Sequence, residues 1–183
     1  MDKTLFSTLF LYYLIHFTHG KRGFDIYLNE VNCTSNPKFV HTSVCFIDKA
    51  QYKQGRLFLD FLIIDDIPKF SISLEIFIIR SANEKFSLIN LKNYDGCAFL
   101  GEKSETNLVN IYKEILAKAG ELPICPLSKD LKLSFKNLGI DADKFPPYLP
   151  DANFSAVAEF KVNNEFCYLV QLDGSVVQKR KFG

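Results

Sequence analysis

The sequence predicts a mainly β protein, an antiparallel β-sandwich that carries one amphipathic helix. Three observations lead to this prediction. Several segments alternate apolar and polar side chains with a period of two, which is typical of half-buried strands. Turn-forming residues separate these segments along the chain. One stretch follows the 3.6-residue period of a helix instead.

The predicted strands are spread over most of the chain. The alternation is clearest in residues 70–76, 131–136 and 154–162. Residues 56–64 are apolar on both faces, which favours a central strand. Further strand candidates are residues 24–31, 39–47 and 85–91. About eight strands separated by turn signals fit a β-sandwich.

The helix is predicted between Ser104 and Gly120. Ser104 is a suitable N-cap, and Gly120 a suitable residue just beyond the last turn. The apolar stripe of this segment follows helical spacing and is interpreted as core packing. Its members are Leu108, Ile111, Tyr112, Ile115, Leu116 and Ala119.

The last predicted hairpin has a loop at Asn163, Asn164 and Glu165. A three-residue loop pairs Val162 with Phe166. The same register pairs Phe160 with Tyr168 and Ala158 with Val170, so both apolar sets share one face. It also directs Cys167 away from the Phe160 face, and it points Asn153 and Ser155 outward.

The composition indicates a folded globular protein without a nucleic-acid partner. Of 183 residues, 48% are hydrophobic and 23% are charged. Lys and Arg together number 22 and Asp and Glu 21, which gives a formal net charge of +1. This balance lacks the excess of cations by which nucleic-acid-binding proteins contact phosphates.

Residues 1–20 have the layout of a secretory signal peptide. Lys3 precedes an apolar run from Leu5 to Phe17, and Thr18, His19 and Gly20 follow it. The run is too short to cross a bilayer, which takes about 20 apolar residues, so no transmembrane anchor is expected. The predicted organisation is a signal peptide at 1–20 and a single β-sandwich domain at 21–183, secreted from the cell.

The sequence offers few residues for catalysis. His41 is the one histidine that remains after the predicted cleavage, and a half-buried position in a strand is the favoured interpretation. No two-histidine metal site can form, and no nucleophile elbow, phosphate-binding glycine loop or dinucleotide fingerprint occurs. A hydrolase would depend on His41 or on carboxylates such as Asp65 with Asp66, or Asp141 with Asp143. We therefore expect no enzyme, cofactor or metal.

The cysteines and sequons agree with secretion. Cys33, Cys45, Cys97, Cys125 and Cys167 all follow the predicted signal peptide, and secreted chains with several cysteines are normally cross-linked. Five cysteines allow 15 ways to form two bonds with one left over. Two N-x-[ST] sequons predict glycosylation at Asn32 and Asn153.

An ordered set of short motifs extends over most of the chain after residue 20. Cys33 and Cys45 are followed by the run Asp95-Gly96-Cys97-Ala98-Phe99-Leu100 and then by Cys125-Pro126. This pattern resembles the CheB-like domain-of-unknown-function family of insects, which is thought to share the ML lipid-recognition fold of the ganglioside activator. The chain departs from the family in lacking Gly in the segment from Pro150 to Phe154, and in having Cys167.

The resemblance implies an ML-like or immunoglobulin-like sandwich with an apolar cavity between its sheets. It suggests disulfides Cys33–Cys45 and Cys97–Cys125, which leaves Cys167 either unpaired or in a bond to another molecule. A rival map links Cys33 or Cys45 to Cys167, as in the ganglioside activator. Some members of the family are linked to chemosensation, including the perception of contact pheromones.

Together these observations predict a secreted, non-enzymatic binding protein for a lipid or another hydrophobic small molecule. The alternative is a secreted interaction module with a closed core, which modulates a cell-surface receptor or channel. The carrier prediction requires a set of inward-facing residues that line the pocket: Phe58, Phe70, Ile72, Leu74, Ile76, Leu133, Phe135, Phe160, Tyr168 and Val170.

Overall fold

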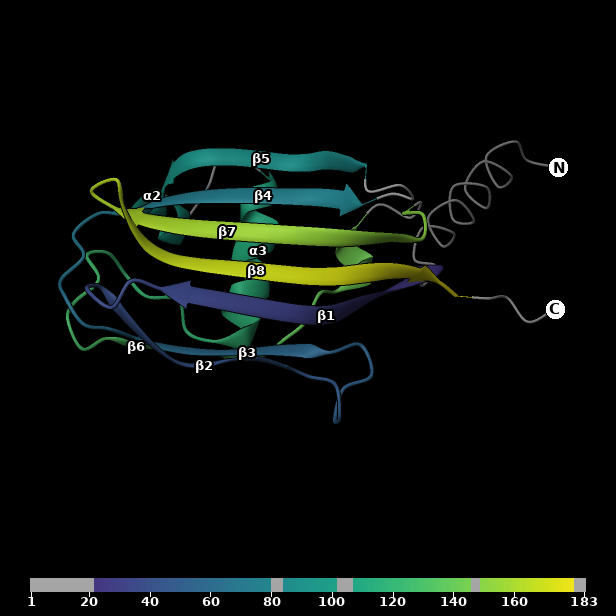
Figure 1. Cartoon of the computed structure of the whole chain (residues 1–183), viewed down its shortest axis with the longest axis horizontal. Helices are drawn as coiled ribbons and strands as arrows, with labels where there is room; N and C mark the ends of the chain where they lie inside the picture. Colours follow the sequence, from purple (N-terminus) through teal and green to yellow (C-terminus); the bar gives the residue numbers. More distant parts are fainter. Residues whose placement is uncertain (1–21, 80–83, 102–106, 146–148, 180–183) are drawn as a thin grey trace, which may run out of the picture.

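The chain forms two antiparallel sheets with helices along one side (Figure 1). The structure is a computed structural model that describes residues 22–79, 84–101, 107–145 and 149–179. The larger sheet has the strand order β1-β8-β7-β4-β5, and the smaller sheet the order β2-β3-β6. The strands are β1 (Phe24–Ser35), β2 (Val40–Asp48), β3 (Arg56–Ile63), β4 (Ser71–Ile79), β5 (Lys85–Asp95), β6 (Lys132–Leu138), β7 (Ala152–Val162) and β8 (Glu165–Gln178). The predicted β-sandwich is confirmed.

The two sheets meet at one edge and are bridged by helices at the other. Strands β1 and β2 lie side by side, and the Cys33–Cys45 disulfide joins them. At the opposite edge, α2 (Gly96–Leu100) follows β5, and α3 (Asn107–Ala119) packs on β6. Figure 1 shows α3 running across the strands behind the larger sheet. The contact between β1 and β2 therefore closes one edge of the space between the sheets, and the helices lie at the other.

The pattern of apolar residues sets the faces of the strands. In β3, Leu57, Leu59 and Ile63 are buried between the sheets, because side chains two residues apart share a face. β3 is the central strand of the smaller sheet, as its apolar character on both faces predicted. Phe58 belongs to the opposite face, where it stacks on Phe46 with 5.2 Å between ring centroids. The expectation that Phe58 faces the space between the sheets is therefore wrong.

The β7–β8 hairpin confirms the predicted register but not the predicted loop. Phe160 pairs with Tyr168 and Ala158 with Val170, as expected. The turn itself, however, has two residues, Asn163 and Asn164, and Val162 pairs with Glu165. A register shift between Phe160 and Lys161 then restores the apolar pairing, which is the effect of a β-bulge.

The bulge also changes where Cys167 points. Cys167 and Tyr168 are both buried, and both belong to the core cluster between the sheets. Strict alternation would place the two side chains on opposite faces, but a bulge adds a residue and breaks the alternation locally. The prediction that Cys167 faces away from the Phe160 cluster is wrong for this reason. Ser155 is likewise buried rather than exposed, whereas Asn153 is exposed.

The predicted helix is present as α3, and α2 was not expected. Ser104, the proposed N-cap, lies outside the described residues, and α3 ends at Ala119 directly before Gly120. α2 starts after Asp95, whose carboxylate accepts hydrogen bonds from the backbone N–H groups of Cys97 and Ala98. This is an N-cap, which explains why the chain leaves β5 and turns into a helix at that point.

The proposed signal peptide, residues 1–20, lies outside the described residues. Within the described ranges, no helix has the length and apolar character needed to cross a membrane.

Candidate functional site

An apolar cavity of about 380 Å³ lies between the two sheets and under α3. Both sheets, both helices and the segment after α3 contribute to its wall, and no charged residue lines it. Protein interiors normally contain few voids larger than a water molecule, so a space of this size distinguishes this core from that of an ordinary filled sandwich. Its volume lies within the range of small-molecule binding sites, roughly 300–1,000 Å³.

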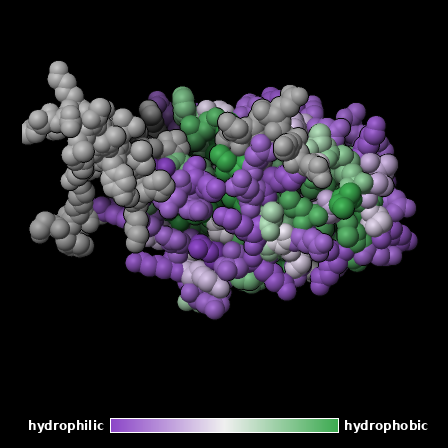
Figure 2. All heavy atoms as spheres, turned by 180° about the vertical axis from the view of Figure 1, so that it is seen from behind, coloured by the Kyte–Doolittle hydropathy of each residue, from purple (hydrophilic) through white to green (hydrophobic). Residues whose placement is uncertain are grey.

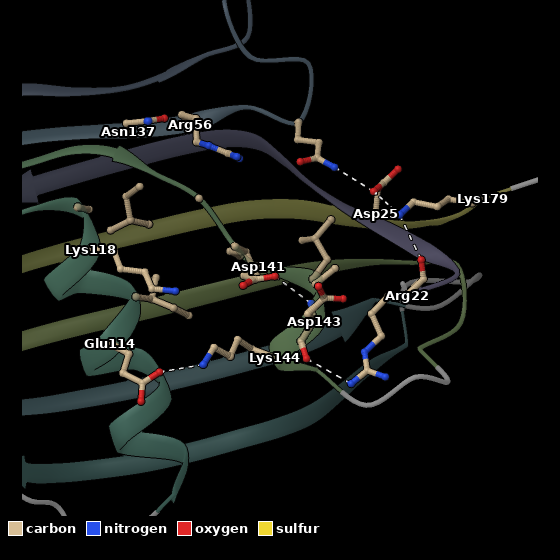
Figure 3. Close-up of a pocket in the computed structure, with 18 residues that line it drawn as sticks. Arg22, Asp25, Arg56, Glu114, Lys118, Asn137, Asp141, Asp143, Lys144 and Lys179 are labelled. Carbon is tan, nitrogen blue, oxygen red and sulfur yellow. Dashed lines mark hydrogen bonds and ion pairs between the residues drawn. The ribbon is translucent and has the colours of Figure 1, made fainter. Parts of the chain in front are cut away.

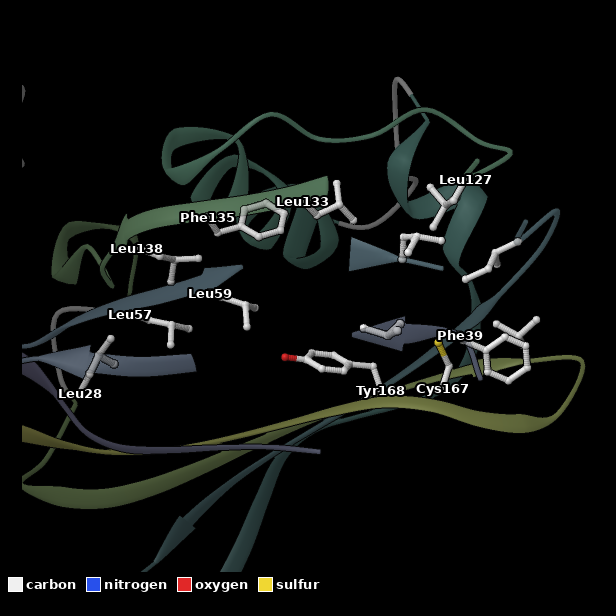
Figure 4. Close-up of a cluster of buried hydrophobic side chains, with 14 residues drawn as sticks. Leu28, Phe39, Leu57, Leu59, Leu127, Leu133, Phe135, Leu138, Cys167 and Tyr168 are labelled. Atoms are coloured by element: carbon white, nitrogen blue, oxygen red, sulfur yellow. The ribbon is translucent and has the colours of Figure 1, made fainter. Parts of the chain in front are cut away.

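The structure places nine of the ten predicted pocket residues on this cavity. They are Phe70, Ile72, Leu74, Ile76, Leu133, Phe135, Phe160, Tyr168 and Val170. Phe58 is the exception, because it occupies the outer face of the smaller sheet. The buried cluster that supports the cavity appears in Figure 4, where Leu133 and Phe135 of β6 lie across from Tyr168 of β8.

Strand periodicity does not predict the part of the wall that comes from α2, α3 and the segment after α3. Tyr112, Ile115 and Leu116 of α3 face the cavity, and their apolar stripe is equally typical of ordinary core packing. Leu100 and Leu122 add to the same side. A helical stripe shows which face is covered but not whether the covered space is filled, so the pattern alone could not identify a cavity wall.

Small side chains on β7 explain where the volume comes from. Ala158 lies between Leu74 of β4 and Val170 of β8, and Ala156 lies in the same way between Ile76 and Leu172. All six side chains line the cavity. Because alanine side chains are short, the two alanines in the middle of the larger sheet leave unfilled volume next to that sheet.

The residues of the lining whose side chains carry a polar group are Tyr94, Tyr112, Tyr168 and Cys167. Desolvation by burial raises the pKa of Tyr112 to about 12 and the pKa of Cys167 to about 11. Burial also raises the pKa of Tyr168. The cavity therefore presents a neutral, predominantly hydrocarbon surface.

Tyr168 holds a buried hydroxyl group whose hydrogen-bonding capacity is unused. The residue is 3% exposed, and its ring stacks on Phe61 with 5.2 Å between centroids. The Thr42 hydroxyl lowers the pKa of Tyr168, but by less than burial raises it. Neither hydroxyl completes a hydrogen bond of normal geometry with a described residue. Groups of this kind are uncommon in protein interiors.

The two disulfides hold opposite sides of the cavity. Cys33–Cys45 closes the edge where β1 and β2 meet. Cys97–Cys125 joins α2 to the segment that follows α3. Both match the pairing implied by the resemblance, and the rival pairing of Cys167 is wrong, because Cys167 is a free, buried cysteine.

A second hollow, here called the polar cleft, lies beside the cavity near the start of β1 and the end of β6. Its volume is about 520 Å³, and its lining contains both signs of charge (Figure 3). Glu114 and Lys144 form an ion pair of 3.0 Å, and Asp25 and Lys179 one of 3.1 Å. Hydrogen bonding to Glu114 raises the pKa of Lys144.

The remaining proposed site residues are distributed over the surface. Asn32 and Asn153, the sequon asparagines, are both exposed. His41 is exposed on β2 rather than half-buried as expected. Among the residues that the structure describes, no group of three or more His, Cys, Asp or Glu side chains is arranged to hold a metal ion.

Part of the chain is similar to a family of unknown function. Residues 72–156, a little under half of the chain, match the model of a family described as Protein of unknown function (DUF1091). The match runs from β4 into β7, and it includes Cys97, Cys125 and much of the cavity wall. No curated protein matches the chain.

Proposed function

We propose that this protein is a secreted, non-catalytic carrier of a lipid or another hydrophobic small molecule, which it binds between its two sheets. The observation that carries the proposal is the cavity of about 380 Å³ whose lining contains no charged residue. Two disulfides and the signal-like residues 1–20 support export, because disulfides persist mainly in oxidising compartments.

The energetics of such a cavity favour a hydrocarbon ligand. Burial of one methylene group contributes about 0.8 kcal/mol, so ten methylenes give about 8 kcal/mol before costs. Losses of translational freedom and chain flexibility subtract several kcal/mol. The remainder supports micromolar binding without any hydrogen bond. The resemblance to the insect CheB-like family and the ML fold adds chemosensation, including pheromone perception, as the proposed context.

The decisive experiment fills the cavity with a larger side chain on β7. Ala158→Phe places an aromatic ring in the space between Leu74 and Val170, whereas Val157→Phe places the same ring on the opposite face of β7. We expect Ala158→Phe to weaken binding of an apolar fluorescent probe at least tenfold and to remove lipid that co-purifies with the protein. Val157→Phe should keep both.

Protein from a secreting host is extracted with organic solvent, and the extract is measured by mass spectrometry. If the folded wild-type protein yields no lipid and binds no apolar probe, the carrier proposal is wrong. If both variants lose binding equally, the bound probe is not between the sheets.

A second candidate function, an interaction module that modulates a receptor or channel, is favoured by one surface feature. Phe46 is 49% exposed and stacks on Phe58 on the outer face of the smaller sheet. An exposed aromatic pair of this kind is typical of protein contact surfaces. Apolar patches also reach the surface on the side shown in Figure 2. Loss of partner capture by Phe46→Ser, with probe binding intact, would favour this second function.

A further inference from the structure

The polar cleft and the apolar cavity share a wall. Ile26, Ile115, Leu138 and Ile140 line both hollows. One side of these four aliphatic side chains therefore faces hydrocarbon, and the other side faces a space lined with charged groups. A ligand with an apolar tail and a polar head matches this arrangement, because each part would lie in the environment that solvates it best.

Three cations of the cleft, Arg22, Arg56 and Lys118, have no carboxylate partner among the described residues, and Arg22 donates to the backbone carbonyl of Asp143. Lys118 of α3 makes no ion pair or hydrogen bond with any described residue. Arg56 donates to the backbone carbonyl of Gly55 and lies over the ring of Tyr52. By contrast, Lys144 and Lys179 are paired with Glu114 and Asp25. The positive charge without a carboxylate partner thus lies on Arg22, Arg56 and Lys118. Arg56 lies against Gly139, between the shared residues Leu138 and Ile140, and Lys118 follows the shared residue Ile115 by about one helical turn.

Most carboxylates of the cleft already take part in an ion pair or accept a hydrogen bond. Glu114 and Asp25 belong to the two ion pairs. Asp141 accepts a hydrogen bond from the backbone N–H of Asp143 and so caps the short helix η2 (Ala142–Lys144). Asp143 also faces the cleft, and its backbone carbonyl accepts from Arg22. Figure 3 shows Lys118 and Glu114 projecting from α3 towards the segment that carries these groups.

Gly139 gives Arg56 its place in the wall. A Cβ atom at this position would lie 2.4 Å from one guanidinium nitrogen of Arg56. The guanidinium therefore lies against the backbone of this segment, and an alanine here would displace it. Arg56 thus places a planar donor beside the shared wall, which suits recognition of a carboxylate or phosphate.

We infer that the ligand is an amphiphile with an anionic head: its hydrocarbon tail passes between the side chains that the two hollows share and occupies the cavity, and Arg56 and Lys118 bind its carboxylate or phosphate oxygens in the polar cleft. This inference rests on the proposed carrier function and goes beyond it, since a carrier of neutral hydrocarbons would need no cleft.

The test compares one tail with two heads. Binding of cis-parinaric acid and of its methyl ester is measured by fluorescence titration at neutral pH. The variants are Arg56→Gln, Lys118→Gln and Gly139→Ala, and the control is Lys132→Gln, which removes an exposed cation of β6 outside the cleft. Oleate and a lysophosphatidic acid then compete with the bound probe, which distinguishes a carboxylate head from a phosphate head.

We expect the acid to bind the wild-type protein about tenfold more tightly than the ester. Arg56→Gln, Lys118→Gln and Gly139→Ala should remove most of this preference and change affinity for the ester less than twofold, whereas Lys132→Gln should change neither. Equal affinity for acid and ester in all proteins would overturn the anionic head and leave the carrier function standing. Failure of both probes to bind would overturn the carrier function itself.

Discussion

At the scale of single residues, the thiol of Cys167 makes the free energy of unfolding depend on pH in the alkaline range. Cys167 is 5% exposed and has no disulfide partner. Burial favours the neutral thiol and raises its pKa from 9.0 to about 11. The raised pKa means that the folded state holds the proton more tightly than the unfolded state. The resulting stabilisation is complete below pH 9 and is lost as the pH rises from 9 to 11.

We predict that the free energy of unfolding falls between pH 9 and pH 11, and that Cys167→Ala makes this fall less steep. One such group contributes at most about 1.4 kcal/mol per pH unit. Urea unfolding at pH 7, 9 and 10.5 measures the slope. Tyr112→Phe is the matched comparison, because burial raises the Tyr112 pKa from 10.0 to about 12 and its effect begins one unit higher. Identical slopes in the wild type and Cys167→Ala would contradict the prediction.

Cys167 also shows where inference from the sequence stops at this scale. Pairing of apolar residues correctly predicted Phe160 opposite Tyr168, because a slip by one residue would expose a whole apolar face. Phe166, Cys167 and Tyr168 are three apolar residues in a row, so alternation alone could not locate the bulge among them. A three-residue loop, and a two-residue loop followed by a bulge, both pair the same residues further along the strands.

At the scale of elements, the β7–β8 turn has the conformation of a type I′ hairpin. Asn163 and Asn164 have φ values of 51° and 65°. A two-residue loop with positive φ at both positions suits the twist of the flanking strands. Asparagine tolerates this conformation better than most residues, and glycine adopts it without steric cost.

We predict that Asn164→Gly raises the free energy of unfolding by about 0.5 kcal/mol and that Asn164→Ala lowers it by about 1 kcal/mol, because Ala pays the full cost of positive φ. Urea unfolding of the three proteins in parallel measures both changes. Lys136→Ala, at an exposed position on β6, serves as control and should change stability little. If Asn164→Ala is as stable as the wild type, the turn conformation is not what holds this hairpin.

The elements differ in how far the sequence determines them. α3 and the strands could be predicted, because each repeats a local period of hydrophobic residues. The polar cleft could not, since Arg56, Lys118 and Gly139 come from three distant segments that only the fold brings together. The nine predicted pocket residues that line the cavity follow from strand periodicity, but this periodicity is the same in a filled sandwich as in a hollow one.

At the scale of the whole molecule, the two disulfides have similar energetic effects but different positions relative to the cavity. They close loops with sequence separations of 12 and 28 residues. Loop entropy assigns them about 3 and about 3.5 kcal/mol respectively. Cys33–Cys45 holds the edge where the sheets already meet. Cys97–Cys125 instead anchors a stretch of cavity wall, of which Phe99, Leu100 and Leu122 are members.

We therefore predict that the two bonds affect stability alike and ligand exchange differently. Cys97→Ala/Cys125→Ala should accelerate release of a bound apolar probe at least fivefold, because the wall formed by α2 and the segment after α3 is then free to move outward. Cys33→Ala/Cys45→Ala should change release less than twofold, since β1 and β2 remain packed side by side. Stopped-flow displacement measures the release, and circular dichroism verifies that each variant is folded. Equal acceleration in both variants would mean that release depends on global loosening, and it would remove the distinction between a closed edge and a mobile wall.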